Sequence, residues 1–190
     1  MEVAVTGKAE WRGTKFGGMT AAEMNDFLAG PWLARVACLK PDGSPYIFPA
    51  WYHWDGVAFW LVPRARSAWA HYLVADPRVS LVVDEPEPPI RKVVCEGTAV
   101  CVEAAVGPYL ENGEMSVWNK IGTYETGPRY LGDKVGDYRG EVNVEPCWTF
   151  KIVPRKLTTW QGWGWAKRYE HAELHGGDEG EAVVRPKYYG

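Results

Sequence analysis

The stretch DGSPYIFPAWYHWDG, residues 42–56, decides the fold, because it places one aromatic strand between two tight turns. Each turn contains an Asp-Gly pair, and glycine supplies the positive φ that such turns need. Residues 34–39 before this stretch and residues 57–62 after it read as strands, and residues 46–53 form the strand between them. Three strands joined in this way form a meander, so the sequence predicts antiparallel β-structure.

Three further strands are predicted after the meander, at residues 78–84, 91–103 and 147–153. Residues 156–160 extend or follow the last of these. Gly97 lies in the middle of the long strand, where a glycine is typical of a bend or bulge in a curved barrel.

Helices are predicted between these strands. Thr20 begins the first, because Glu23 stands three residues later in the spacing of a capping box, and Gly30 ends it. Residues 67–75 form a second helix, and residues 107–140 are helical or irregular. Six strands with helix inserted after the third and before the sixth favour a mainly β fold with helices (α+β), a six-stranded antiparallel split β-barrel.

The chain of 190 residues is long enough for one well-buried domain. We expect residues 1–18 to form an N-terminal arm, residues 19–168 to form the barrel, and residues 169–190 to form a polar C-terminal tail.

Charge and hydropathy narrow the possible partners. The formal net charge is −3 and no basic patch appears, which argues against nucleic acid as a partner. No apolar run approaches the ~18 residues of a membrane span, and no basic region followed by an apolar run marks a signal peptide. We therefore expect a cytoplasmic protein that binds neither nucleic acid nor a membrane.

Metal chemistry has little support in the sequence. The cysteines form no CxxC pair and lie in apolar, strand-like runs, so buried free thiols are expected at Cys38, Cys95, Cys101 and Cys147. His171 and His175 have helical i, i+4 spacing but no third ligand at hand, so we expect no metal site. His53 and His71 are expected to be solvated or satisfied in the core.

A basic segment stands where the third strand ends and the second helix begins. Arg64, Arg66 and Ser67 there could bind a phosphate, since the first amides of a helix are free and arginine adds a forked donor. The alternative is a solvated basic turn in which Ser67 caps its helix.

Aromatic residues are unusually frequent, with 11 tryptophans in the chain. Trp51 and Trp60 lie on the second and third strands, where they could stack on a flat ligand or close its pocket. The alternative is that alternate side chains of these strands simply fill the barrel core. A stacking surface beside an anion site is what a flat aromatic cofactor with a phosphate tail needs.

Several motifs together resemble the pyridoxamine 5′-phosphate oxidase-like family of split-barrel flavin-binding proteins. The resemblance covers about residues 20–168. Its motifs are Asp42–Pro45, Pro49–Trp51, Trp54–Gly56, Ser67-Ala68, Leu73–Leu81, Glu96–Ala99, Arg129–Gly132, Pro154–Lys156 and Trp160.

The resemblance implies the FMN-binding split-barrel fold and a homodimer with two cofactor sites at the subunit interface. It implies FMN, or a related deazaflavin, lying across the second and third strands. We therefore expect an FMN-dependent oxidoreductase that acts on an unidentified small molecule, for which the many tryptophans suggest an aromatic or bulky apolar substrate. The alternatives are a deazaflavin-dependent reductase, a non-enzymatic flavin- or haem-binding protein, and a dimeric barrel without cofactor.

The resemblance also implies a set of cofactor-binding residues, whereas no catalytic acid or base can be named. The set is Tyr46, Ile47, Phe48, Pro49, Ala50, Trp51, Trp60, Leu61, Arg64, Arg66, Ser67, Ala68, Trp69, Lys92, Trp160 and Arg168. Lys92 could stabilise a reduced, anionic flavin, or could be an ordinary surface lysine.

Two positions leave alternatives open. The family commonly has a lysine where this chain has Trp69, so either Arg64 and Arg66 hold the phosphate or the protein prefers another cofactor. The run from Trp160 through Trp163 to Trp165 could line a substrate pocket or form a dimer contact.

Overall fold

The computed structural model describes residues 18–87, 90–136, 145–162, 173–176 and 182–185. The expected arm, apart from Gly18, lies outside the described residues. So do the candidates Trp163, Trp165, Arg168 and His171.

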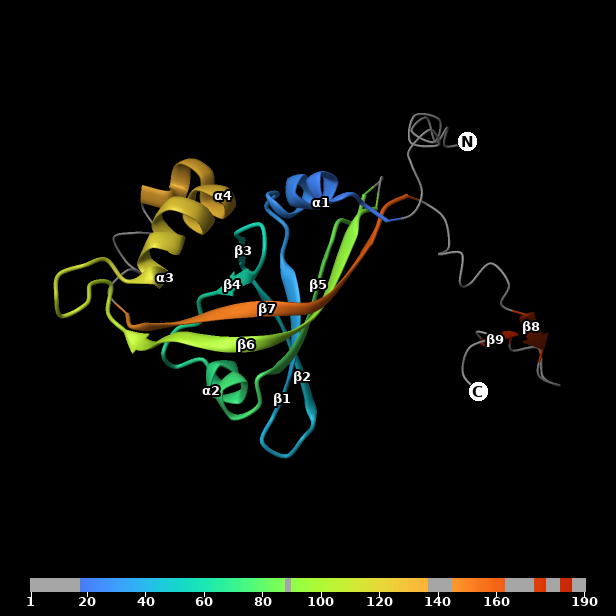
Figure 1. Cartoon of the computed structure of the whole chain (residues 1–190), viewed down its shortest axis with the longest axis horizontal. Helices are drawn as coiled ribbons and strands as arrows, with labels where there is room; N and C mark the ends of the chain where they lie inside the picture. Colours follow the sequence, from blue (N-terminus) through green and yellow to red (C-terminus); the bar gives the residue numbers. More distant parts are fainter. Residues whose placement is uncertain (1–17, 88–89, 137–144, 163–172, 177–181, 186–190) are drawn as a thin grey trace, which may run out of the picture.

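One antiparallel sheet of seven strands forms the body of the molecule (Figure 1), in the order β2-β1-β5-β6-β7-β4-β3. The strands are β1 (Ala34–Leu39), β2 (Pro45–Ala50), β3 (His53–Trp54), β4 (Phe59–Leu61), β5 (Arg78–Asp84), β6 (Lys92–Val106) and β7 (Cys147–Trp160). The fold class expected from the sequence is confirmed. A separate hairpin of β8 (Glu173–Gly176) and β9 (Ala182–Arg185) lies in the expected tail.

The strand count of six is corrected to seven, because the strand expected at residues 46–53 breaks in two. Ala50 at the end of β2 pairs with Ala34 of β1, whereas His53 at the start of β3 pairs with Trp60 of β4. Only Trp51 and Tyr52 join these two strands, which are the opposite edges of the sheet. Since successive Cα atoms are about 3.8 Å apart, this link brings the edges together and curls the sheet into a split barrel.

The bend predicted at Gly97 is confirmed. The pairing of β6 with β7 shifts register between Glu96 and Gly97. A Cβ atom at Gly97 would lie 2.7 Å from the carbonyl oxygen of Val153 on β7, a distance that side chains do not tolerate. The absence of a side chain therefore lets the two longest strands approach and curve.

Two helices close the barrel. Helix α1 (Ala21–Leu28) has the predicted capping box, in which Thr20 and Glu23 bond each other's backbone amides, and it buries Phe27 and Leu28. Helix α2 (Ala68–Ala75) lies at the opposite end of the barrel (Figure 1). The core between the two helices is apolar and includes Val36, Phe59, Leu73, Leu81, Phe150 and Ile152.

A helical segment, here called the cover, fills most of the region expected to be helical or irregular. It consists of α3 (Val117–Lys120), a π-helix η2 (Ile121–Thr126), α4 (Gly127–Leu131) and a 3₁₀ turn η3 (Gly132–Lys134). In Figure 1 the cover lies beside β3 and β4, above one end of β6 and β7.

The expectation of four buried free thiols is corrected at one position. Cys38, Cys95 and Cys147 are buried and free, but Cys101 is exposed. Cys101 precedes a register shift in the pairing of β6 with β7, where the burial alternation of the strand ends. None of the helices within the described ranges is long and apolar enough to cross a membrane.

Candidate functional site

The site lies on the outer face of the barrel, and strand register shows why. Phe59 and Leu61 of β4 are buried in the core, so Trp60 between them points outward. Trp60 pairs with Lys151 of β7, and Lys151 pairs with Val100 of β6. Paired residues share a face of the sheet, so the three side chains form one outward row.

A cleft of about 280 Å³ opens next to this row, between the barrel and the cover. The strands and the turn after β4 contribute Pro49, Ala50, Trp51, Trp60, Val62, Pro63, Arg64 and Cys147. Helix α2 contributes Ser67 and Trp69, and the cover with its flanks contributes Trp118, Gly122, Thr126, Gly127 and Val135. The cleft therefore combines aromatic rings with polar groups from distant parts of the chain.

The aromatic walls of the cleft are held by defined contacts. Trp51 stacks on Tyr130 of α4, with ring centres 4.8 Å apart and planes 3° from parallel. The Trp60 indole nitrogen donates to Asp55 at 2.7 Å, and the Lys151 ammonium lies 5.1 Å from the Trp60 ring centre. These contacts fix both indoles before any ligand arrives, which lowers the entropy cost of stacking.

The polar end of the cleft is built by Arg64 and Ser67. Ser67 stands at the N-cap of α2, yet its hydroxyl makes no capping hydrogen bond within the described turn. The alternative use of Ser67 as a helix cap is therefore not realised. Glu145 lies close by, 3.7 Å from Arg64 and 2.7 Å from Arg66.

Trp69 fills the position where the family commonly has a lysine. Its ring stacks on Phe48 at a centre distance of 4.2 Å and an angle of 21°. Trp69 thus anchors to the core while it lines the cleft. An aromatic surface stands there in place of a cation.

The cover is bound to the barrel at its two ends. At the first end, the Glu103 carboxylate accepts the backbone amides of Val117 and Trp118 at 2.7 and 3.1 Å and the Thr149 hydroxyl at 2.6 Å. This arrangement satisfies free amides at the start of α3 and places Trp118 over the cleft.

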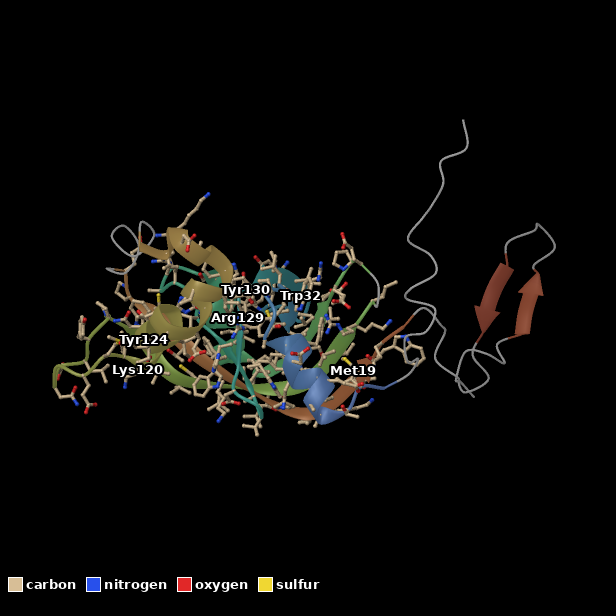
Figure 2. The ribbon with its side chains drawn as sticks, turned by 90° about the horizontal axis from the view of Figure 1, so that it is seen from above. Met19, Trp32, Lys120, Tyr124, Arg129 and Tyr130 are labelled. Atoms are coloured by element: carbon tan, nitrogen blue, oxygen red, sulfur yellow. The ribbon has the colours of Figure 1, made fainter. Side chains whose placement is uncertain are left out.

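At the other end of the cover, α4 is bonded to the chain that joins the barrel edges. Arg129 donates to the carbonyl of Tyr52 at 3.0 Å, and the Tyr130 hydroxyl donates to the carbonyl of Trp32 at 2.6 Å. Figure 2 shows Arg129, Tyr130 and Trp32 side by side. The cover is therefore a fixed wall of the cleft.

The structure brings seven of the sixteen sequence candidates into the cleft lining: Pro49, Ala50, Trp51, Trp60, Arg64, Ser67 and Trp69. Phe48 and Leu61 point into the core. Tyr46 packs against Phe48 and Tyr72. Ile47, Arg66 and Ala68 are exposed outside the lining.

Lys92 and Trp160 lie elsewhere on the sheet. They face each other across β6 and β7, at the opposite end of the strand pair from Cys147, and Lys92 is exposed. Within one chain they therefore do not join the cleft.

Sequence reasoning missed the contribution of the cover. The lining residues Trp118, Gly122, Thr126, Gly127 and Val135 come from several short helical elements in succession. Two of them, Gly122 and Thr126, lie in a π-helix, which does not follow the 3.6-residue period. For Cys147 the sequence predicts only a buried thiol. It lies in the cleft wall, and burial raises the pKa of its thiol.

A second cavity of about 250 Å³ shares the Trp60 wall. Its polar lining comprises His53, Asp55, Lys120, Tyr124 and Glu125, and Figure 2 shows Lys120 and Tyr124 along the cover. The Nδ1 atom of His53 is buried without a hydrogen-bond partner among the described residues, 3.5 Å from the Glu125 carboxylate. Burial lowers the pKa of His53, and the charge of Glu125 partly opposes this effect.

Solved structures share this architecture. A conserved hypothetical protein of Mycobacterium tuberculosis is 26% identical, with a TM-score of 0.57 over 76% of this chain and 86% of that one. An FAD-binding protein of Mesorhizobium loti is 22% identical, with a TM-score of 0.53 over 79% of this chain and 98% of that one. The heme storage protein HutZ of Vibrio cholerae is 15% identical, with a TM-score of 0.53 over 75% of this chain and 95% of that one. The last two likenesses show the fold alone.

A comparison with curated proteins finds no match. The family model described as pyridoxamine 5′-phosphate oxidase matches residues 20–126, more than half of the chain. This match spans the strands β1 to β6, helix α2 and most of the cover. The chain therefore belongs to the pyridoxamine 5′-phosphate oxidase family.

Proposed function

We propose that this protein is an FMN-dependent oxidoreductase whose cofactor binds in the cleft between the barrel and the cover. The observation that carries the proposal is the meeting of Trp51, Trp60 and Trp69 with Arg64 and Ser67 around one hollow. Flat rings can stack on the isoalloxazine, and the polar end can bind the phosphate. The bound flavin supplies hydride-transfer chemistry, and the protein supplies binding, orientation and exclusion of water.

The donor set fits the phosphate of FMN, although only in part. The Arg64 guanidinium can donate in parallel to two oxygens, and the Ser67 hydroxyl is not used as a helix cap. The first amides of α2 add further donors. The lysine that would add another cation is replaced by Trp69, so Arg64 and Ser67 carry most of the binding.

The cleft of one chain is small for a whole cofactor. Its volume of about 280 Å³ is at the lower end of small-molecule sites. A second copy of the chain, placed against the outer face, would add a further wall. We therefore propose that the protein acts as a homodimer.

An apolar patch marks where the second copy would bind. Val94, Val100, Val102 and Val153, here called the valine face, are between 36% and 46% exposed on β6 and β7. Val100 belongs to the same outward row as Trp60, so the valine face continues into the cleft wall. Lys92 and Trp160 lie on the same two strands, from which they could complete the cleft of the partner.

Flavin titrations test the anion site. FMN and riboflavin share the ring system, and only FMN carries the phosphate. Replacing Arg64 and Arg66 together with alanine should weaken FMN binding by roughly tenfold or more and leave riboflavin binding nearly unchanged. Equal weakening of both ligands, measured by fluorescence quenching, would show that the arginines do not bind the phosphate.

A deazaflavin-dependent reductase is the second candidate, and Trp69 favours it. The stack of Trp69 on Phe48 enlarges the aromatic wall where a lysine would otherwise meet the phosphate. Titration of the purified protein with FMN, a deazaflavin and haem separates the candidates. Tight FMN binding with an oxidised-flavin spectrum supports the first proposal, and a preference for the deazaflavin supports the second. A Soret band indicates a haem-binding protein, and binding of none of the three leaves a dimeric binding module.

A further inference from the structure

We infer that Glu145 acts as an internal anion that engages Arg64 and Arg66 at the edge of the cleft and thereby limits the affinity of the cleft for phosphorylated ligands. The inference rests on the proposed function in one respect, namely that the ligand of the cleft carries a phosphate. It adds a residue that sets how strongly the cleft prefers that phosphate.

Two arginines already surround the Glu145 carboxylate. Arg66 bonds both carboxylate oxygens at 2.7 Å, and Arg64 lies 3.7 Å from one of them. Arg64 lines the cleft and its side chain is 25% exposed, whereas the Arg66 side chain is 76% exposed. Guanidinium groups that converge on one carboxylate have the arrangement of an anion receptor.

The backbone keeps Glu145 at this place. The amide of Ala65 donates to the carbonyl of Pro146 at 2.9 Å, and Arg64 pairs with Cys147 in an isolated β-bridge. The segment that carries the carboxylate is therefore hydrogen-bonded to the turn that carries both arginines. Glu145 remains a neighbour of the arginines even when its side chain swings away.

The net charge of Arg64, Arg66 and Glu145 determines how strongly the cleft binds a phosphate. Two arginines and one carboxylate sum to a net charge of +1, and an incoming phosphate monoester carries about −1.5 to −2. The phosphate must displace the carboxylate from Arg64 and Arg66 and must then tolerate it nearby. Both effects oppose the binding of FMN, and neither acts on riboflavin.

The test compares wild-type protein with Glu145→Gln, which keeps the shape of the side chain and removes its charge. The dissociation constant for FMN should fall about three- to tenfold, whereas that for riboflavin should not change. The control is Asp42→Asn, which removes an exposed carboxylate in the turn between β1 and β2, outside both the cleft lining and the valine face. It should change neither affinity.

Other results overturn the inference. Unchanged or weaker FMN binding in Glu145→Gln would make Glu145 a residue that orients Arg66 rather than a competitor. An equal gain for both flavins would indicate a general change of the cleft. Glu145→Lys provides a second variant, for which the selective gain for FMN should be larger.

A phosphate probe separates this inference from the proposed function. Inorganic phosphate should raise the melting temperature of Glu145→Gln more than that of wild type, at an ionic strength matched with chloride. In the double variant that combines Glu145→Gln with Arg66→Ala, phosphate should raise the melting temperature no more than it does in wild type. If wild-type protein binds neither flavin, the proposed function fails, and the phosphate shift still decides the role of Glu145. If phosphate raises the melting temperature equally in wild type, Glu145→Gln and the double variant, the proposed role of Glu145 is rejected.

Discussion

Gly97 shows how a single residue sets the curvature of the barrel. A methyl group there would lie 2.7 Å from the Val153 carbonyl oxygen. We expect Gly97→Ala to lower the free energy of unfolding by roughly 1–3 kcal/mol, because one of the two long strands must move. Urea unfolding measures this loss.

The matched control is Gly107→Ala, where the added atom would lie 3.7 Å from the nearest atom, an ordinary contact. This variant should stay within about 0.5 kcal/mol of wild type. A Gly97→Ala protein as stable as the control would mean that β6 and β7 have room to separate.

His53 makes stability depend on pH. Burial lowers its pKa in the folded protein, against an ordinary value of about 6.5 in the unfolded chain. At a pH between the pKa of the folded protein and that of the unfolded chain, the unfolded chain binds more protons than the folded protein. The free energy of unfolding therefore falls as the pH drops below about 6.5. The groups that act on the imidazole are Glu125 and Asp55, which favour its charge, and Arg129, which opposes it.

Melting temperatures between pH 5 and pH 8 test this dependence. The decline below about pH 6.5 should be smaller in His53→Gln, which keeps a polar side chain without the titration. An identical decline in both proteins would assign the effect to other groups. An NMR titration of the imidazole would give the pKa of His53 directly.

The π-helix is the element on which the shape of the cleft depends. At its C-terminal end, the amide of Gly127 bonds the carbonyl of Gly122, and a Cβ atom at Gly127 would lie 2.4 Å from that oxygen. We expect Gly127→Ala to disrupt the turn and to increase amide hydrogen exchange across residues 117–131.

Gly122→Ala is the paired control for the π-helix. A Cβ atom at this position meets nothing within 4 Å, so the cover should keep its exchange pattern. Both glycines line the cleft, so each variant adds a methyl group to the lining. Only Gly127→Ala should also disturb the backbone, and the comparison therefore distinguishes an altered fold from an altered lining. Faster exchange in both variants would mean that glycine is needed for backbone flexibility rather than for space.

The elements that sequence reasoning predicted well are those with local signals. Each of these signals, namely the Asp-Gly turns, the Thr20 capping box and the alternation of β1 and β5, is contained in a few neighbouring residues. The break at Trp51 was missed, because the aromatic pattern continues across it while the hydrogen bonds change partner. The contact of Glu103 with Val117 was missed because it joins residues 14 positions apart.

In the candidate site, too, the parts with local sequence signals were predictable and the parts that depend on distant contacts were not. The Arg64–Ser67 segment and the aromatic strand were recognisable because their chemistry is written in neighbouring residues. The role of Glu145 could not be predicted, because its partner Arg66 lies 79 residues earlier in the sequence and only the fold brings the two together. The cover residues come from short helical elements, one of them a π-helix, whose few residues show no clear sequence period.

At the scale of the whole molecule, the valine face predicts association. We expect wild-type protein to be a dimer in light scattering, and Val100→Lys to be a monomer, because a buried unpaired ammonium would cost several kcal/mol. FMN binding should weaken together with dimerisation if the partner completes the cleft.

Val74→Lys provides the control for association. Val74 is 54% exposed on α2, outside the sheet, so a lysine there should leave the dimer intact. A monomeric wild-type protein, or a dimeric Val100→Lys, would place the contact between copies elsewhere.

The short link through Trp51 and Tyr52 has a mechanical consequence. The edge strands β2 and β3 meet here without a ladder of hydrogen bonds, and the same link supplies the Trp51 indole, on which a flat molecule would rest. A ligand bound there would hold the two edge strands together. Its release should therefore loosen β2 and β3 before it affects the long central strands β6 and β7.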